Sequence, residues 1–314
     1  MRIFLFLLLI FTIATHQGAA FAQVGAERRI ALSFDDAPRG DGPAFTGAQR
    51  TEALLAGLRA AEVDTVAFFV TTRGLDDEAG RNRIARYAEA GHLIANHSHS
   101  HVWLSGTEPD VYVADIDRAE ALLQPYANRR PWFRFPFLDE GNIRETRDRL
   151  RAALDQRGLM NGYVTIDNYD WYIEQRWQEA VREGRAVDRD ALRQAYIDMV
   201  LGAAGFYDDL ATNALGRSPA HVLLLHENDI AAAFIEDLVA ALRADGWTII
   251  GPDEAYADPM ASILPHTLMT RQGQVGALAV EAGTDPRTLT HPAIEEDQID
   301  ALLERRDVFG DPGR

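Results

Sequence analysis

The chain has 314 residues, 48 acidic side chains against 31 basic ones, a formal net charge of −17 and no Cys. The length allows one large domain or two ordinary ones, and a hydrophobic fraction of 47% is enough for a sizeable core. The acidic balance, with no basic block, argues against nucleic-acid binding. The missing Cys and the missing Lys exclude disulfides, thiolate metal sites and nucleophilic Cys or Lys catalysis.

The start of the chain has the pattern of an export signal. Arg2 precedes an apolar run, Ile3 to Ala14, that is too short to span a bilayer, and Ala20-Phe21-Ala22 resembles a cleavage site. We therefore expect residues 1–22 to be a signal peptide and the protein to be exported, periplasmic or secreted. It would then begin near Gln23 and keep no stable membrane anchor. An uncleaved N-terminal anchor is the alternative.

The rest of the chain alternates between strand-like apolar runs and helix-like periodic segments. In chain order we expect a strand at Arg29–Phe34, a helix at Ala48–Ala61, a strand at Thr65–Val70, a helix at Arg81–Ala90, a strand at His92–Ala95, a helix at Asp110–Tyr126, a strand at Trp132–Phe135, a helix at Ile143–Arg157, a strand at Tyr163–Ile166, a helical stretch at Ile173–Leu215 interrupted near Gly184, a strand at His221–Leu225, a helix at Ile230–Ala244 and a strand at Trp247–Ile250. Such alternation predicts an α/β fold with parallel strands, either closed as a distorted barrel or open as a doubly wound sheet. No G-x-G-x-x-G or Walker pattern follows a strand, so nucleotide binding has no support.

The last part of the chain, residues 259–314, has weaker periodicity and one helical pattern, at Glu295–Arg306. We expect it to be a C-terminal extension packed on the barrel rather than a second domain. The preceding residues, 23–258, would then form the main domain.

Ionisable residues follow the C-terminal ends of five predicted strands: Asp35 and Asp36, His97 and His101, Arg134, Asp167 and Asp170, and His226. In a parallel barrel these strand ends converge on one face, which is where chemistry is done. Each position alone is weak evidence, but their coincidence at strand ends indicates a site.

The run His97-Ser98-His99-Ser100-His101 is a candidate metal site. Its outer His residues are four apart, so one helical turn would put both imidazoles on one side. Neutral imidazole suits Zn²⁺ and similar ions, and a catalytic site takes three protein ligands plus water. Asp35 or Asp36 could be the third ligand, which leaves the other free as a base. A His-rich surface loop is the alternative, and His99 is expected to point elsewhere.

Arg134 and His226 lie in apolar surroundings. Arg134 stands between Phe133 and Phe135, and a buried guanidinium there needs a carboxylate partner, for which Asp35 would serve. The alternative is a surface Arg in an aromatic patch. His226 emerges from a buried strand, where a lone His is more often a satisfied core residue than a catalyst.

Five short motifs follow one another along the chain between Ile30 and Gly251. They read Ser33-Phe34-Asp35-Asp36-Ala37-Pro38, His97-Ser98-His99-Ser100-His101, Arg134-Phe135-Pro136, Asp167-Asn168-Tyr169-Asp170-Trp171 and Leu224-Leu225-His226. In order and spacing they resemble the motifs of the NodB-homology polysaccharide deacetylases, carbohydrate esterase family 4. The resemblance implies a distorted (β/α)7 barrel, with residues 23–258 as the catalytic domain.

The resemblance also implies catalytic roles. Asp35 would be the catalytic base, tethered by Arg134, and His226 would be the general acid, oriented by Asp170. The implied cofactor is a divalent metal ion, Zn²⁺ with Co²⁺ as the alternative, and its implied ligands are Asp36, His97 and His101.

Substrate contacts are implied for three further residues. Trp171 and Leu224 would line the acetyl pocket, and the backbone N–H of Phe137 would bind the oxyanion. Two residues depart from the family motifs, because Ala37 and Leu138 each stand where Gly is usual. If the first of these positions needs a positive φ, Ala37 would be strained there. Leu138 belongs to a loop that borders the substrate groove in the family, so the substrate preference stays open.

The expected function is therefore an exported, metal-dependent hydrolase that removes N-acetyl groups from an amino-sugar polymer or oligomer, such as peptidoglycan, a chitin-type glycan or an exopolysaccharide. The expected partner is a carbohydrate and not nucleic acid. Two alternatives stay open: the same metal site could act on O-acetyl esters or a small non-sugar amide, or the protein could be a catalytically silent carbohydrate binder. The negative net charge only weakly disfavours an anionic polymer, since the local field governs a groove.

Overall fold

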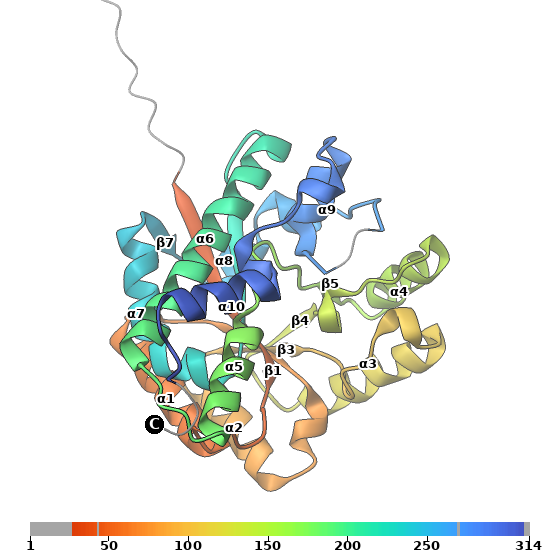
Figure 1. Cartoon of the computed structure of the whole chain (residues 1–314). Coiled ribbons are helices and arrows are strands. Elements are labelled where there is room, and N and C mark those ends of the chain that lie inside the picture. Colours follow the sequence, from red (N-terminus) through yellow and green to blue (C-terminus); the bar gives the residue numbers. More distant parts are fainter. Residues whose placement is uncertain (1–26, 43, 269–270, 311–314) are drawn as a thin grey trace, which may run out of the picture.

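The computed structural model describes residues 27–42, 44–268 and 271–310 (Figure 1). The predicted signal peptide lies outside the described residues. Among those that are described, no helix is both long enough and apolar enough to span a bilayer.

The core of the fold is a curved sheet of parallel strands. The strands are β1 (Arg28–Ala37), β2 (Ala67–Val70), β3 (Leu93–Asn96), β4 (Arg129–Phe133), β5 (Met160–Asn161), β6 (Ala220–His226) and β7 (Trp247–Ile249). They pair in the order β5-β4-β3-β2-β1-β6, and β7 pairs with the first residues of β1. All of these pairings are parallel, which confirms the predicted α/β topology.

The ring of strands is closed by an irregular segment, so the barrel is distorted. The predicted strand at Tyr163–Ile166 is wrong, because regular pairing there is limited to the two-residue β5 and to one bridge between Ile166 and Leu223. The Thr165 N–H donates to the Val222 carbonyl (3.0 Å), and the Val222 N–H donates to the Thr165 hydroxyl (2.7 Å). A side chain thus takes the place of a backbone partner, which interrupts a regular ladder.

Helices surround the sheet (Figure 1). They are α1 (Gly47–Ala60), α2 (Glu78–Glu89), α3 (Pro109–Leu123), α4 (Arg144–Gln156), α5 (Asp170–Arg182), α6 (Arg189–Leu215), α7 (Asp229–Ala244), α8 (Pro252–Tyr256), α9 (Gly273–Glu281) and α10 (Glu296–Arg305). Local signals explain several boundaries. Thr46 and Gln49 form a capping box at α1, and the predicted interruption near Gly184 separates α5 from α6 because Gly184 has φ +67°.

Alternate side chains of β1 pack into two different clusters of buried residues, one on each face of the strand. Ile30, Leu32 and Phe34 pack into the large core beneath the helices, whereas Ala31 belongs to a second cluster of buried residues. Because successive side chains of a strand point to opposite faces, Asp35 shares the inner face with Ala31. The strand therefore aims this carboxylate into the barrel.

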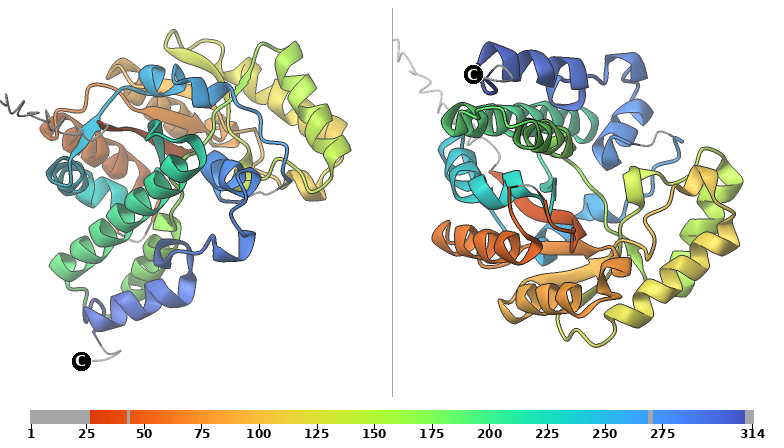
Figure 2. Two further views of the ribbon diagram at one scale, coloured as in Figure 1. Left: turned by 90° about the horizontal axis from the view of Figure 1, so that it is seen from above. Right: turned by 60° about the horizontal axis from the view of Figure 1, so that its bottom comes forward.

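The C-terminal extension packs along α5 and α6 (Figure 2). The Tyr169 N–H donates to the Ala293 carbonyl (2.8 Å), and the Tyr172 hydroxyl donates to Asp300 (2.9 Å). The helix predicted at Glu295–Arg306 is present as α10, but α9 was not predicted from the sequence. The extension thereby contacts the helix that begins with Asp170.

Candidate metal centre and active site

Asp35 is buried at the end of β1 and paired with Arg134. The exposed fraction of Asp35 is 2%, and its Oδ1 accepts a hydrogen bond of 2.6 Å from Arg134. The same guanidinium donates to the Ser33 hydroxyl (2.9 Å), the Gly162 carbonyl (2.8 Å) and the Tyr256 hydroxyl (2.9 Å). A buried charge needs such partners, and these hold Arg134 in one orientation against the carboxylate.

Three candidate metal ligands gather beside Asp35. The ligand atoms of Asp36, His97 and His101 all lie within 4.8 Å of one another. Asp36 Oδ1 is 3.6 Å from His97 Nε2 and 3.1 Å from His101 Nε2, and Asp35 Oδ2 is 3.7 Å from His97 Nε2. Both aspartates therefore have a carboxylate oxygen within 3.7 Å of His97 Nε2.

The ring of His97 is oriented by its second nitrogen. His97 Nδ1 lies 2.9 Å from the Arg134 carbonyl oxygen, and a carbonyl can only accept, so Nδ1 carries the proton. Burial lowers the pKa of His97 to about 4, so the ring is neutral near pH 7. The Nε2 lone pair is thus free and aimed at Asp36, as a metal-binding imidazole requires.

Asp36 is ionised in these surroundings. Burial would raise its pKa, but the hydrogen bond with His101 and the charges of His226, His101 and His97 hold the pKa of Asp36 well below its ordinary value. An ionised carboxylate beside neutral imidazole is a suitable donor set for a divalent ion.

The segment that carries His97 and His101 is a loop rather than the predicted helical turn. Ser98 and His101 have positive φ values (+68° and +54°). The carboxylate of Asp115 accepts the N–H groups of His99 (2.8 Å) and Ser100 (3.0 Å) that a helix would have used elsewhere. His99 points away from the candidate ligands, as predicted, and its Nδ1 lies 3.0 Å from the Thr72 hydroxyl.

His226 lies next to Asp35 because their strands pair in register. In the β1–β6 ladder Asp35 and His226 are direct partners. His226 Nδ1 is 2.6 Å from Asp170 Oδ1, and the His226 N–H donates to Asp170 Oδ2 (2.8 Å). Burial opposes a charge on His226, but the charge of Asp170, its hydrogen bond with the ring, and the charges of Asp36 and Asp35 raise the pKa of His226 to about 9. The imidazole is therefore a proton donor near neutral pH.

Asp170→Asn is expected to lower the pKa of His226, because it removes the negative charge bound to the ring. If protonated His226 donates a proton in the reaction, activity falls as the pH rises through its pKa. The alkaline limb of kcat against pH should therefore move down by at least about 1 pH unit in the variant. Both profiles are measured at equal metal loading. An unmoved limb would mean that another group titrates.

Comparisons with known proteins support the family resemblance. A sequence profile described as Polysaccharide deacetylase matches residues 22–160. A peptidoglycan-N-acetylglucosamine deacetylase of Bacillus cereus is 29% identical over 153 residues, which are 48% of this chain and 50% of that protein. Both matches support the resemblance of this chain to the NodB-homology polysaccharide deacetylases. Chitin deacetylase 2 of Saccharomyces cerevisiae is 33% identical over 89 residues, 28% of this chain and 27% of that one. The chain thus spans half or less of the length of these curated relatives.

Solved structures agree on the fold of this chain. A family 4 pseudoenzyme from Bacillus anthracis has a TM-score of 0.50 at 15% identity, and covers 73% of this chain and 65% of its own. A mutant of a family 4 pseudoenzyme with restored activity has a TM-score of 0.51 at 17% identity, with coverages of 73% and 67%. At these identities the likeness concerns the fold alone, and it confirms the expected distorted barrel.

The two departures from the deacetylase motifs have different consequences. Asp36, rather than Ala37, has the positive φ (+67°) in the first motif, so Ala37 is not strained. In the third motif Phe137 and Leu138 both have positive φ values, +59° and +52°. Leu138 therefore occupies a backbone conformation that favours Gly, with a cost of about 1–2 kcal/mol.

An aromatic column beside His101 was not predicted. The rings of Trp103 and Phe137 stack with centroids 4.0 Å apart, and Phe137 meets His101 edge-on at 4.6 Å. The Arg271 guanidinium lies over Trp103 at 4.8 Å. Trp103 and Phe137 are each 38% exposed, so the column joins a candidate metal ligand to the C-terminal extension at the surface. The only sequence signal for Trp103 was its place two residues after His101.

The other two predicted substrate residues are Leu224 and Trp171. Leu224 is buried two residues before His226 on β6 and so shares its face. Trp171 follows Asp170 in α5, and its ring contacts Tyr169 at 5.0 Å. Asp167 is buried nearby, and burial raises the pKa of Asp167 to about 8, so it is largely protonated at pH 7.

Proposed function

We propose that this protein is a metal-dependent hydrolase that removes N-acetyl groups from an amino-sugar polymer or oligomer. The observation that carries the proposal is one constellation: an Arg-bound aspartate within 3.7 Å of a metal-ligand cluster, with an Asp-bound histidine as its partner on the next strand. The curated relatives, one a peptidoglycan deacetylase and one a chitin deacetylase, support this substrate class.

The donor set fits a divalent metal ion, with Zn²⁺ as the first choice and Co²⁺ as the alternative. His97 Nε2, His101 Nε2 and Asp36 Oδ1 supply two imidazoles and one carboxylate, the number of protein ligands that an open catalytic zinc site uses. When bound, the ion would polarise the acetyl carbonyl and make water easier to deprotonate.

Asp35 would act as the general base. Its Oδ1 is held by Arg134, while its Oδ2 faces the ligand cluster and can accept the proton of the attacking water. The backbone N–H of Phe137, in its left-handed turn, would donate to the oxyanion of the tetrahedral intermediate.

His226 would act as the general acid. An acetamide has a poor leaving group, so the nitrogen must gain a proton as the carbon–nitrogen bond breaks. Protonated His226 would donate that proton, and Asp170 would keep the ring charged and oriented. The products are acetate and a free amine. Trp171 and Leu224 would line the pocket for the acetyl methyl group.

We also propose that the protein acts outside the cytoplasm. The signal-like residues 1–22 support export, residues 23–258 would form the catalytic domain, and residues 259–314 would be an extension of it. The contacts of that extension with α5 and α6 support this division.

The test is acetate release by the purified protein from chitin oligomers, peptidoglycan fragments and acetylated xylan. Each substrate is tested as purified, after chelation, and after addition of Zn²⁺ or Co²⁺. We expect chelation to remove activity and the metal to restore it, with one new amine per acetate. Acetate without amine would make the protein an esterase. A protein that holds no metal and releases no acetate would instead be a silent binder.

A further inference from the structure

A cavity of about 350 Å³ opens directly beside the candidate metal ligands. Its lining includes Asp36 and His101 and two arginines, Arg39 and Arg73. The volume is within the range of small-ligand pockets, about 300–1,000 Å³. A chain with net charge −17 therefore has two cations at the mouth of its site.

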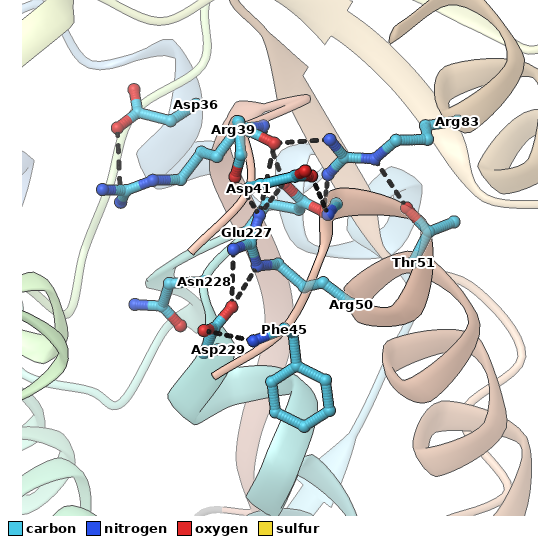
Figure 3. Close-up of polar contacts among 12 residues, drawn as sticks. Asp36, Arg39, Asp41, Phe45, Arg50, Thr51, Arg83, Glu227, Asn228 and Asp229 are labelled. Carbon is cyan, nitrogen blue, oxygen red and sulfur yellow. Dashed lines mark hydrogen bonds and ion pairs between the residues drawn. The ribbon is translucent and has the colours of Figure 1, made fainter. Parts of the chain in front are cut away.

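The backbone of Arg39 is held by buried ionic groups (Figure 3). Its N–H donates to Glu227 Oε2 (2.8 Å), and its carbonyl accepts from Arg50 (3.2 Å) and from Arg83. Glu227 and Arg50 are almost fully buried, and Arg50 is bound in turn by Asp229. Arg39 therefore has a fixed backbone, so less ordering is needed when its side chain binds a ligand.

The side chain of Arg39 points to the outer oxygen of Asp36 (Figure 3). Its Nη1 is 3.8 Å from Asp36 Oδ2, whereas Asp36 Oδ1 faces the two histidines. The Arg39 side chain is 35% exposed. A single long contact leaves most of its donors open to the cavity.

Arg73 is exposed and makes no ion pair within the part of the chain that the structure describes. Its backbone N–H donates to the His99 carbonyl (3.0 Å), so it is anchored to the loop that carries His101. Two guanidinium groups therefore line one cavity, and the one carboxylate contact that they make among the described residues is the 3.8 Å one between Arg39 and Asp36, so a bound anion would reduce the repulsion between them.

We propose that Arg39 and Arg73 form a subsite for a carboxylate carried by the substrate close to the acetamido group that is hydrolysed. Guanidinium forks match the two oxygens of a carboxylate and bind it with charge-assisted hydrogen bonds. The inference rests on the proposed function and narrows it to acidic amino-sugar glycans. The charged side chains that line this cavity, two arginines and one aspartate, thus have a balance opposite in sign to the net charge of the chain.

The cavity continues into a longer groove. A second cavity, of about 780 Å³, shares Pro38, Arg39, Gly40 and Gly74 with the first. A polymer could run from the metal ligands across Arg39 into this groove. The carboxylate could then belong to the sugar that loses its acetyl group or to the next one along.

The test compares acidic oligomers with the same oligomers after their carboxyl groups are reduced to alcohols. One pair alternates N-acetylglucosamine with N-acetylmuramic acid, and the other alternates N-acetylglucosamine with glucuronic acid. We expect reduction to lower kcat/KM by about tenfold in at least one pair. This is the lower end of the effect expected from losing a hydrogen bond to a charged group. Arg73→Gln should abolish this preference. The matched control is Arg59→Gln, on an exposed part of α1 that lines neither cavity; it should keep the preference.

Neutral chitin oligomers separate the two proposals. If the protein releases acetate from chitin oligomers and carboxyl reduction has no effect on either acidic pair, the proposed subsite is overturned. The proposed deacetylase function then still stands. If no substrate is turned over, calorimetric binding of the same pairs decides. Tighter binding of the acidic member by the wild type, lost in Arg73→Gln, supports the subsite, whereas equal affinity overturns it.

Discussion

Asp35→Asn is expected to lower kcat for acetate release by about 10²–10⁴-fold while the protein keeps its metal ion, because the amide cannot accept the proton of water. Asp36→Asn should instead lower the metal content, because Asp36 Oδ1 faces both imidazoles. Acetate release and elemental analysis of the purified variants measure the two effects. The replacements are equal in size and adjacent in sequence, so each is the control for the other.

The opposite pattern would contradict this division between the two aspartates. If Asp35→Asn lost the metal and Asp36→Asn kept it, the ligand and the base would have to be exchanged. Asp64→Asn, at an exposed position between α1 and β2, controls for the loss of one negative charge. Circular dichroism checks that Arg134, deprived of its ionised partner, has not disturbed the fold.

Arg50→Met is expected to lower the free energy of unfolding by about 3–5 kcal/mol, because it leaves the buried carboxylate of Asp229 without its cation. Arg50 is 2% exposed, and its Nη2 is 2.5 Å from Asp229 Oδ1 and its Nη1 3.8 Å from Glu227 Oε2. Glu174 is buried beside them, and burial raises its pKa. Urea unfolding followed by circular dichroism measures the loss.

Arg86→Met is the matched control. Arg86 also binds a glutamate, with its Nη2 2.9 Å from Glu52 Oε1, but the side chains are 51% and 57% exposed. Exposed ion pairs contribute little to stability, so this variant should unfold at the same urea concentration as the wild type. Equal midpoints for Arg50→Met and the control would show that the buried ion pairs do not stabilise the fold.

The sequence could predict the parts of the site that follow from strand periodicity. Asp35, Arg134 and His226 each come at or directly after the end of a strand, and parallel strand ends meet on one face of a barrel. The structure places them there. The choice between Asp35 and Asp36 as metal ligand rested on the family resemblance, because periodicity alone does not tell which of two adjacent carboxylates turns inward.

Features that depend on distant partners could not be predicted. The loop from His97 to His101 is bound by Asp115, on α3, so local spacing wrongly predicted a helical turn. Arg50 and Asp229 are 179 residues apart, and nothing in either neighbourhood pairs them. The segment at 163–166 has strand-like residues, but the hydroxyl of Thr165 replaces a ladder partner.

The register of β1 against β6 has a consequence for how this protein can vary. Seven consecutive pairs, from Arg29 with Ala220 to Asp35 with His226, fix the spacing between the two side chains. The helical segment that contains α5 and α6 lies between β5 and β6 in the chain and contributes no pair to this ladder. A change in the length or surface of α6 would therefore leave the spacing between Asp35 and His226 unchanged.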